Sequence, residues 1–260
     1  MHALTTSALI GLLVAAGCAG WIDAVAGGGG LIQLPALLIG ISGERPATIL
    51  GTNKLSSVVG TSAATATYLR QPSAKPDAKT ATAMAGIAFI GSMFGAHVAT
   101  LVSPSFFRPF VFFLLIAVGL WTWLRPALGQ HEQLRWPGQA RHMVVAIAAG
   151  GVIGFYDGIF GPGTGSFLVF VLVSVLGYSF LRASATAKIV NLGTNIAALI
   201  VFGAGRHLLV PLGLAMGACN LVGGIIGARM AAARGSGFVR IAFLAVVSVL
   251  VLRIGWDMWR

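Results

Sequence analysis

The stretch GWIDAVAGGGG at residues 20–30 returns in altered form as GFYDGIFGPGTG at residues 154–165. Both versions place an aspartate, Asp23 or Asp157, inside an apolar run and follow it with a cluster of glycines. Each aspartate is followed 31 residues later by a lysine, Lys54 or Lys188. Two copies of one pattern, about 133 residues apart, indicate that the chain consists of two related halves.

The composition around these motifs is typical of a membrane protein. Of 260 residues, 57% are hydrophobic and 9% are charged, whereas roughly 25% of residues are charged in soluble domains. Several apolar segments approach the roughly 20 residues that a helix needs to cross a bilayer. We therefore expect an all-α membrane protein, a polytopic helical bundle of about 8–10 transmembrane segments. The ten apolar segments are residues 4–26, 31–41, 46–69, 80–102, 106–124, 142–160, 166–180, 183–205, 208–230 and 238–256.

The longest polar connector, residues 125–141, lies between the two halves. It divides one transmembrane domain into a first repeat, 1–130, and a second repeat, 131–260. Five segments per repeat is an odd number, so the repeats are expected to be inverted. Lys and Arg gather in the connectors 70–79, 125–141 and 229–240, which the positive-inside rule assigns to the cytoplasm. Ten crossings satisfy this assignment with both termini outside, and re-entrant hairpins at the glycine breaks are the alternative.

The basic residues do not indicate a nucleic-acid partner. The formal charge of +11 is the balance of 17 Lys and Arg and 6 Asp and Glu residues. The basic residues are mostly spread over short connectors, whereas nucleic-acid binding concentrates them in one basic patch. Cys18 and Cys219 lie inside apolar segments without metal-ligand or disulfide spacing. The sequence shows no Ser-His-Asp order and no histidine cluster. We therefore expect no metal, no cofactor and no enzyme activity.

Asp23, Lys54, Asp157 and Lys188 are the formally charged residues that lie inside apolar segments and away from their ends. A charge at the bilayer centre costs at least about 2.5–3.5 kcal/mol, so it normally faces a partner or a polar cavity. In one interpretation the lysines bind an anion, and the aspartates are candidates for proton coupling. In the other, each aspartate only neutralises a lysine and fixes the helices.

The glycine clusters predict helix breaks that expose backbone N–H groups. Glycine tolerates a positive φ, and the free N–H groups at the start of the next helix favour an anion. Close helix packing is the alternative role, expected for scattered glycines such as Gly91 and Gly95. A dinucleotide or P-loop site is excluded because the required strand context is missing. The substrate-binding residues predicted at the two breaks are Gly27, Gly28, Gly29, Gly30, Gly161, Gly163, Thr164, Gly165 and Ser166.

Amide side chains near the lysines complete the predicted substrate site. Asn53 adjoins Lys54 in the third segment. Lys188, Asn191 and Asn195 are spaced i, i+3 and i+7, so they share one face of a helix. A cation with two amides suits an oxyanion, and the same face suits a water path. This spacing makes Lys188 the preferred anion ligand.

Three motifs resemble the sulfite exporter TauE/SafE family of bacterial membrane permeases: GWIDAVAGGGGLIQLP at 20–35, GTNK at 51–54 and YDGIFGPGTGSF at 156–167. The resemblance implies a multi-pass carrier of the bacterial inner membrane that moves sulfur-containing anions such as sulfite, thiosulfate or organosulfonates. We therefore expect a secondary transporter that works by alternating access, with a small anion and the lipid bilayer as its partners. The alternatives are an anion channel and a membrane-embedded enzyme acting on a lipid-like substrate.

Overall fold

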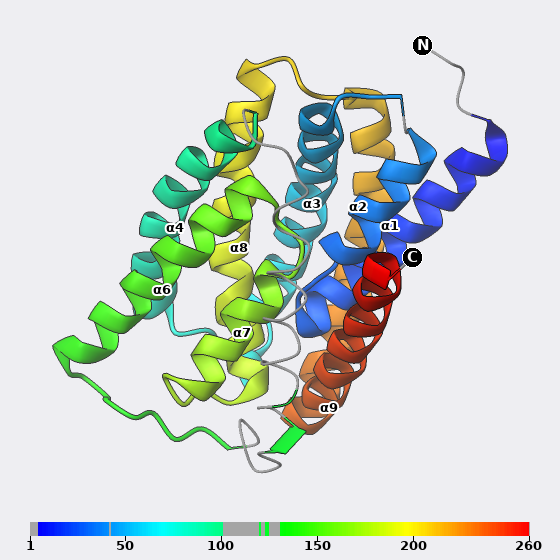
Figure 1. Cartoon of the computed structure of the whole chain (residues 1–260). Coiled ribbons are helices and arrows are strands. Elements are labelled where there is room, and N and C mark those ends of the chain that lie inside the picture. The colour runs from blue at the N-terminus through cyan, green and yellow to red at the C-terminus, as the bar shows by residue number, and fades with distance from the viewer. Residues whose placement is uncertain (1–4, 42, 101–119, 121–122, 125–130, 260) are drawn as a thin grey trace.

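The computed structural model describes residues 5–41, 43–100, 120, 123–124 and 131–259. Within these ranges the chain is helical and contains no strand, which confirms the all-α class (Figure 1). The fifth predicted segment, 106–124, lies almost entirely outside the described residues. The helices are α1 (Thr6–Ala26), α2 (Gly30–Gly40), α3 (Pro46–Leu69), α4 (Ala78–Ala99), α6 (Ala140–Ile159), α7 (Thr164–Ser174), α8 (Phe180–Ala204) and α9 (Val210–Trp259), with a 3-10 turn at Pro72–Ala74.

Among the residues that the structure describes, five helical stretches are long and apolar enough to cross a membrane. They are α1, α4, α6, α8 and residues Val210–Val246 of α9. Helices α2 and α7 have 11 residues each, so each rises only about 16 Å, about half of a ~30 Å hydrocarbon core. The structure therefore favours re-entrant hairpins at α1–α2 and α6–α7 over two further full crossings. Gly235, with φ of 73°, divides α9 into two helices, which correspond to the last two predicted segments.

The two halves interdigitate instead of standing apart. Among the described helices, the most extensive contacts join different halves: α1 with α9, α4 with α6, α3 with α9, and α4 with α8. Figure 1 shows α3 running down the view and α8 running up beside it, while α4 and the first part of α9 also run in opposite directions. Opposite directions of matched helices are what an inverted repeat requires, and the two-fold relation itself stays a prediction.

Glycines allow the outer helices of different halves to pack closely. A Cβ on Gly95 of α4 would lie 2.1 Å from the carbonyl oxygen of Phe155 in α6. A Cβ on Gly223 of α9 would lie 2.0 Å from the carbonyl oxygen of Gly17 in α1. Neither distance is possible for a real side chain. The packing role expected for the scattered glycines is therefore confirmed at Gly95.

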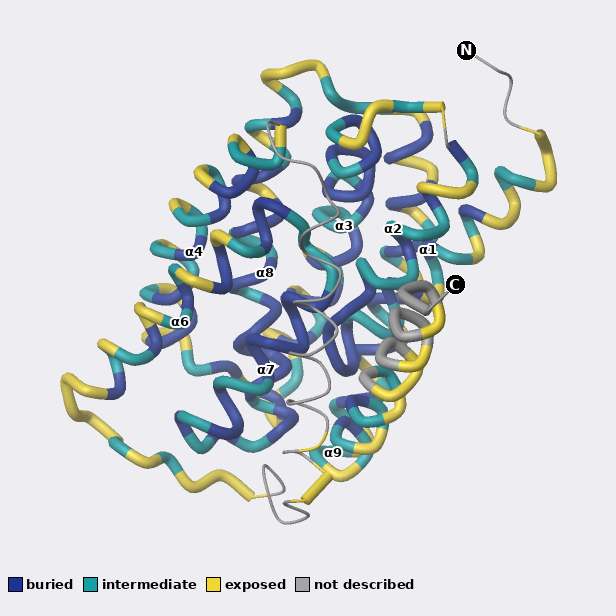
Figure 2. Tube along the Cα trace, in the orientation of Figure 1, coloured by how far each residue is buried: buried dark blue, intermediate teal, exposed yellow. Residues whose placement is uncertain are grey.

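The outer faces of the bundle are apolar and exposed. Phe94, Val152 and Ile241 are 67%, 72% and 67% exposed, and Figure 2 shows exposed residues along the rims of α4, α6 and α9 around a buried centre. Exposed apolar surface on this scale marks a membrane-facing protein. In Figure 1 the connectors 70–77 and 131–139 and the bend between the two parts of α9 all lie toward the lower end of the bundle. This placement agrees with one common side for the three basic connectors, and its assignment to the cytoplasm stays a prediction.

A polar cluster holds the lower end of α4 and α8 together. Asp77 caps α4 by accepting a hydrogen bond of 3.1 Å from the Thr80 N–H, and it accepts a second of 2.8 Å from the Tyr178 hydroxyl. The buried His142 Nε2 lies 3.1 Å from the same hydroxyl. Burial raises the pKa of the Asp77 carboxyl, but these two hydrogen bonds and the positive charge of Arg182 outweigh burial and lower its pKa below the usual value. Asp77 is therefore a stabilising group in its ionised form.

Candidate functional site

The two glycine breaks meet at the centre of the bundle. Helix α1 ends at Ala26, and Gly27 and Gly28 have φ of 75° and 99°. Helix α6 ends before Gly161, whose φ is 82°. A Cβ on Gly27 would lie 2.2 Å from the carbonyl carbon of Gly165, so only glycine lets the breaks come this close. The structure confirms the predicted breaks and places the re-entrant turns of both halves in contact.

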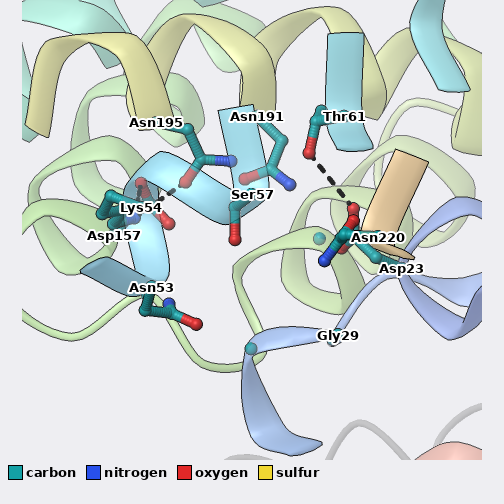
Figure 3. Close-up of a pocket in the computed structure, with 14 residues that line it drawn as sticks. Asp23, Gly29, Asn53, Lys54, Ser57, Thr61, Asp157, Asn191, Asn195 and Asn220 are labelled. Atoms are coloured by element: carbon teal, nitrogen blue, oxygen red, sulfur yellow. Dashed lines mark hydrogen bonds and ion pairs between the residues drawn. The ribbon is translucent and has the colours of Figure 1, made fainter. Parts of the chain in front are cut away.

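A small polar cavity lies between these breaks (Figure 3). Its walls come from α1, α3, α6, α8 and α9 and from the glycine segments. Nearly every side chain that reaches it carries a charge, an amide or a hydroxyl. Polar groups at membrane depth need water, a partner or a ligand, so the cavity is the natural candidate for a binding site. Its lining residues are Asp23, Gly28, Gly29, Gly30, Asn53, Lys54, Ser57, Thr61, Asp157, Gly161, Gly165, Asn191, Asn195 and Asn220.

Two buried ion pairs cross from one half to the other. The Lys54 Nζ lies 2.6 Å from Asp157 Oδ2, and the Lys188 Nζ lies 2.7 Å from Asp23 Oδ2. In the sequence repeat each aspartate accompanies the lysine of its own half, but in the structure the partners are exchanged. The aspartates therefore do neutralise the lysines, and each pair joins the two halves.

The two ion pairs differ in their access to the cavity. Lys54 and Asp157 both line it, and Lys54 also donates a hydrogen bond of 3.0 Å to Asn195 Oδ1. Lys188 is fully buried and does not line it, whereas its partner Asp23 does and is 17% exposed. Asn195, which shares a helix face with Lys188 in the sequence, thus contacts Lys54 in the structure. Lys54, not Lys188, is the cation that a molecule in the cavity would meet.

Two pairs of matched positions from the two halves line the cavity. Ser57 corresponds to Asn191 and Thr61 to Asn195, each pair 134 residues apart. The Thr61 hydroxyl donates to Asp23 Oδ2 at 3.5 Å, while Asn195 accepts from Lys54. The first half therefore contributes hydroxyls where the second half contributes amides. Positions that correspond in the sequence repeat therefore bring different chemical groups to the cavity.

A buried amide network lies beside the cavity and connects α2, α3 and α9. Gln33 Nε2 donates to Asn53 Oδ1 at 3.0 Å, and Gln33 Oε1 accepts from Asn220 Nδ2 at 2.8 Å and from the Ser56 hydroxyl at 3.3 Å. A Cβ on Gly60 would lie 1.7 Å from Asn220 Oδ1, so glycine makes room for this amide. Sequence reasoning did not select Gln33 or Asn220. Each is an amide side chain inside an otherwise apolar segment, and this feature of the sequence could have identified it.

Four predicted site residues that do not line the cavity lie at the breaks themselves: Gly27, Gly163, Thr164 and Ser166. The Ser166 hydroxyl donates to the carbonyl oxygens of Ala26 and Gly27 at 3.3 and 3.1 Å. These carbonyls lie at the end of α1 and need such donors. The Thr164 hydroxyl donates to the Gly161 carbonyl oxygen at 2.8 Å. Gly27 packs on Gly165, and Gly163 precedes α7 with φ of 85°.

The start of α2 faces the cavity through Gly28, Gly29 and Gly30. Within the part of the chain that the structure describes, none of these three N–H groups has a hydrogen-bond acceptor. Free N–H groups and the positive end of the helix dipole attract an anion. In the same described part, no three His, Cys, Asp or Glu residues are grouped as metal ligands. The cavity thus combines an ammonium, amides and backbone N–H groups, which are the donors an oxyanion requires.

Comparison with known proteins shows the family to which the chain belongs. The family model described as Sulfite exporter TauE/SafE matches residues 12–254. The chain is 37% identical over 254 residues to "Probable membrane transporter protein ORF9" of Sinorhizobium sp, which covers 98% of this chain and 95% of that relative. It is 35% identical over 240 residues to "Probable membrane transporter protein YfcA" of Escherichia coli (strain K12), which covers 92% and 86%.

A third relative, from Haemophilus influenzae, is named "Probable membrane transporter protein" and is 32% identical over 245 residues, which covers 92% of this chain and 91% of the relative. No solved structure matches the chain significantly. The family model and the relatives span nearly the whole chain, and five of its helical stretches are suited to cross a membrane. The chain therefore belongs to the sulfite exporter TauE/SafE family, as a multi-pass transporter protein of the bacterial inner membrane.

Proposed function

We propose that the protein is a secondary transporter of small sulfur-containing oxyanions and that the central cavity is its substrate site. The observation that carries this proposal is the position of Lys54, a buried cation in the wall of a polar cavity between two helix breaks. A buried cation at membrane depth is a functional feature by default. The family's description as a sulfite exporter supports the substrate class.

The cavity offers donors on several sides of a bound oxyanion. Lys54 supplies the positive charge, and Asn191 and Asn195 of α8 supply amide N–H groups. The glycines at the start of α2 supply backbone N–H groups. Sulfite, thiosulfate and sulfonates present several oxygens around one sulfur. Each oxygen needs its own donor when the anion leaves water. A site with donors from several helices suits this shape better than it suits a flat carboxylate.

Alternating access is the proposed mechanism, with one half moving against the other around the cavity. The supporting observations are that both ion pairs cross between the halves and that the two glycine breaks touch each other. Inverted-repeat transporters bind substrate near the membrane midplane between broken helices. The opposite directions of α3 and α8 fit such a repeat (Figure 1).

Transport by purified protein in liposomes tests the proposal. Labelled sulfite, thiosulfate, methanesulfonate and acetate are each offered, and uptake is measured with and without the same unlabelled anion inside. A carrier should saturate and should exchange internal for external anion, whereas a channel should not. Lys54→Gln should abolish uptake, while Lys79→Gln, which removes an exposed lysine from the first turn of α4, should not. Equal uptake by Lys54→Gln and the wild-type protein would refute the proposed site.

A further inference from the structure

The positive and negative charges around the cavity balance, because two lysines pair with two aspartates. Lys54 is paired with Asp157, and Lys188 with Asp23, at 2.6 and 2.7 Å. No other charged side chain lines the cavity among the described residues. An anion that enters therefore adds an uncompensated negative charge to a buried site, and a buried charge without a partner is strongly unfavourable.

The charge of Lys54 is already neutralised while Asp157 is ionised. Its Nζ already contacts Asp157 Oδ2 and Asn195 Oδ1. If Lys54 turned to the substrate alone, it would leave a carboxylate that is 1% exposed without its cation. A proton on Asp157 removes this conflict, because the neutral acid no longer holds the ammonium and the substrate becomes its counter-charge.

Asp157, and not Asp23, is placed to take up this proton. Protonation of Asp23 would leave Lys188 as an unpaired cation that is fully buried and does not line the cavity. No substrate in the cavity could then neutralise it. Lys54, by contrast, lines the cavity and can exchange a carboxylate for an anion.

The other titratable groups near the two aspartates already donate their protons elsewhere. The Tyr156 hydroxyl, next to Asp157 in the chain, donates to the Pro162 carbonyl oxygen at 2.6 Å. The Tyr68 hydroxyl, near Asp23, donates to the Ala24 carbonyl oxygen at 2.7 Å. Neither tyrosine is therefore placed to neutralise an aspartate when the anion arrives.

We propose that each substrate anion is transported together with one proton, held on the Asp157 carboxyl group, and that the site selects singly charged oxyanions over doubly charged ones. This inference rests on the proposed function. The balance is simple: the proton converts the Asp157 carboxylate to the acid, and the freed Lys54 ammonium pairs with the anion. The net charge of the site is then the same before and after binding. A divalent anion would leave one negative charge uncompensated.

Methanesulfonate is the probe for the test, because its single charge does not change with pH. Proteoliposomes with a pH-sensitive dye inside are given labelled methanesulfonate while the membrane potential is clamped with potassium and valinomycin. The expected result is one proton taken up per anion and net uptake that follows the pH gradient but not the membrane potential. Thiosulfate should compete for methanesulfonate exchange at least about tenfold more weakly, equivalent to 1.4 kcal/mol.

Asp157→Asn provides the matched variant, because the amide imitates the protonated acid. It should keep methanesulfonate exchange, since exchange needs no net proton movement, and should lose uptake driven by a pH gradient. Added methanesulfonate should stabilise Asp157→Asn against heat at every pH, because the anion replaces the missing counter-charge of Lys54. Lys79→Gln, which changes an exposed lysine away from the cavity, should keep proton-driven uptake.

Each negative result would contradict a different part of the proposal. Methanesulfonate uptake driven by the membrane potential without proton movement would overturn the proton coupling and leave the transporter proposal in place. Thiosulfate competition as strong as that of methanesulfonate would overturn the charge selectivity. The absence of exchange for every anion tested would overturn the proposed function itself. If Asp157→Asn cannot be purified folded, the proton-to-anion ratio of the wild-type protein still decides the question.

Discussion

Replacement of Lys188 by glutamine is expected to destabilise the protein through its partner in the other half. Lys188 is fully buried and pairs with Asp23 at 2.7 Å. Lys188→Gln removes the cation and leaves the Asp23 carboxylate without a counter-charge. Loss of one member of a buried ion pair costs about 3–5 kcal/mol, which corresponds to a fall in melting temperature of roughly 6–20 °C for a domain of this size.

A second substitution, added to Lys188→Gln, shows which aspartate is the ion-pair partner of Lys188. Lys188→Gln with Asp23→Asn removes both charges of one pair and leaves two neutral amides, so most of the lost stability should return. Lys188→Gln with Asp157→Asn breaks both pairs, because it leaves Asp23 and Lys54 unpaired. This combination should be less stable than either single variant. Partners within one half of the sequence would give the opposite order.

Thermal unfolding in detergent, followed by tryptophan fluorescence, provides the stability of each variant in a double-mutant cycle. Anion uptake in liposomes then separates the roles of the pairs. Lys188→Gln with Asp23→Asn should recover both stability and uptake, because neither charge is needed to hold the substrate. Lys54→Gln with Asp157→Asn should recover stability but not uptake, because the cavity has lost its cation. Recovery by Asp157→Asn in the Lys188→Gln background, or uptake by the Lys54→Gln double variant, would refute this reasoning.

Three further predictions follow from the described contacts. Gly27→Ala should cost roughly 3 kcal/mol or more, because the added Cβ meets the Gly165 backbone, whereas Gly11→Ala, with open space around it, should be near neutral in thermal unfolding. The ionised Asp77 carboxyl stabilises the fold at pH values above its unfolded pKa of about 4, and this contribution is lost as the pH falls through its lowered folded pKa. Melting temperatures between pH 7 and pH 3 should therefore fall less steeply for Asp77→Asn than for the wild-type protein. Reporter fusions after Lys75 and after Arg206 should report opposite sides of the membrane, with Lys75 in the cytoplasm, and a common side would contradict the topology.

The sequence by itself determined the class of the protein, the two helix breaks and the charged residues that matter. These features depend on local properties of the chain. Hydrophobic composition decides whether a segment can enter a bilayer, and only glycine readily adopts the positive φ found at Gly27, Gly28 and Gly161. The lysine and aspartate positions were visible because a charge inside an apolar segment is costly wherever the helix packs. The family resemblance rested on the same motifs.

The tertiary structure alone decided which charges meet and which face the cavity. Spacing along one helix placed Asn191 and Asn195 with Lys188, but packing of α3 against α8 brings Asn195 to Lys54. The lengths of α2 and α7 favour re-entrant hairpins, whereas the charge count had favoured full crossings. The charges do not distinguish the two, because a hairpin returns the chain to the side where it entered, as two crossings do. The network of Gln33 and Asn220 joins residues 187 positions apart. Such contacts depend on how the two halves interdigitate. The sequence repeat relates each residue to its counterpart in the other half, but it does not show which residues pack against each other.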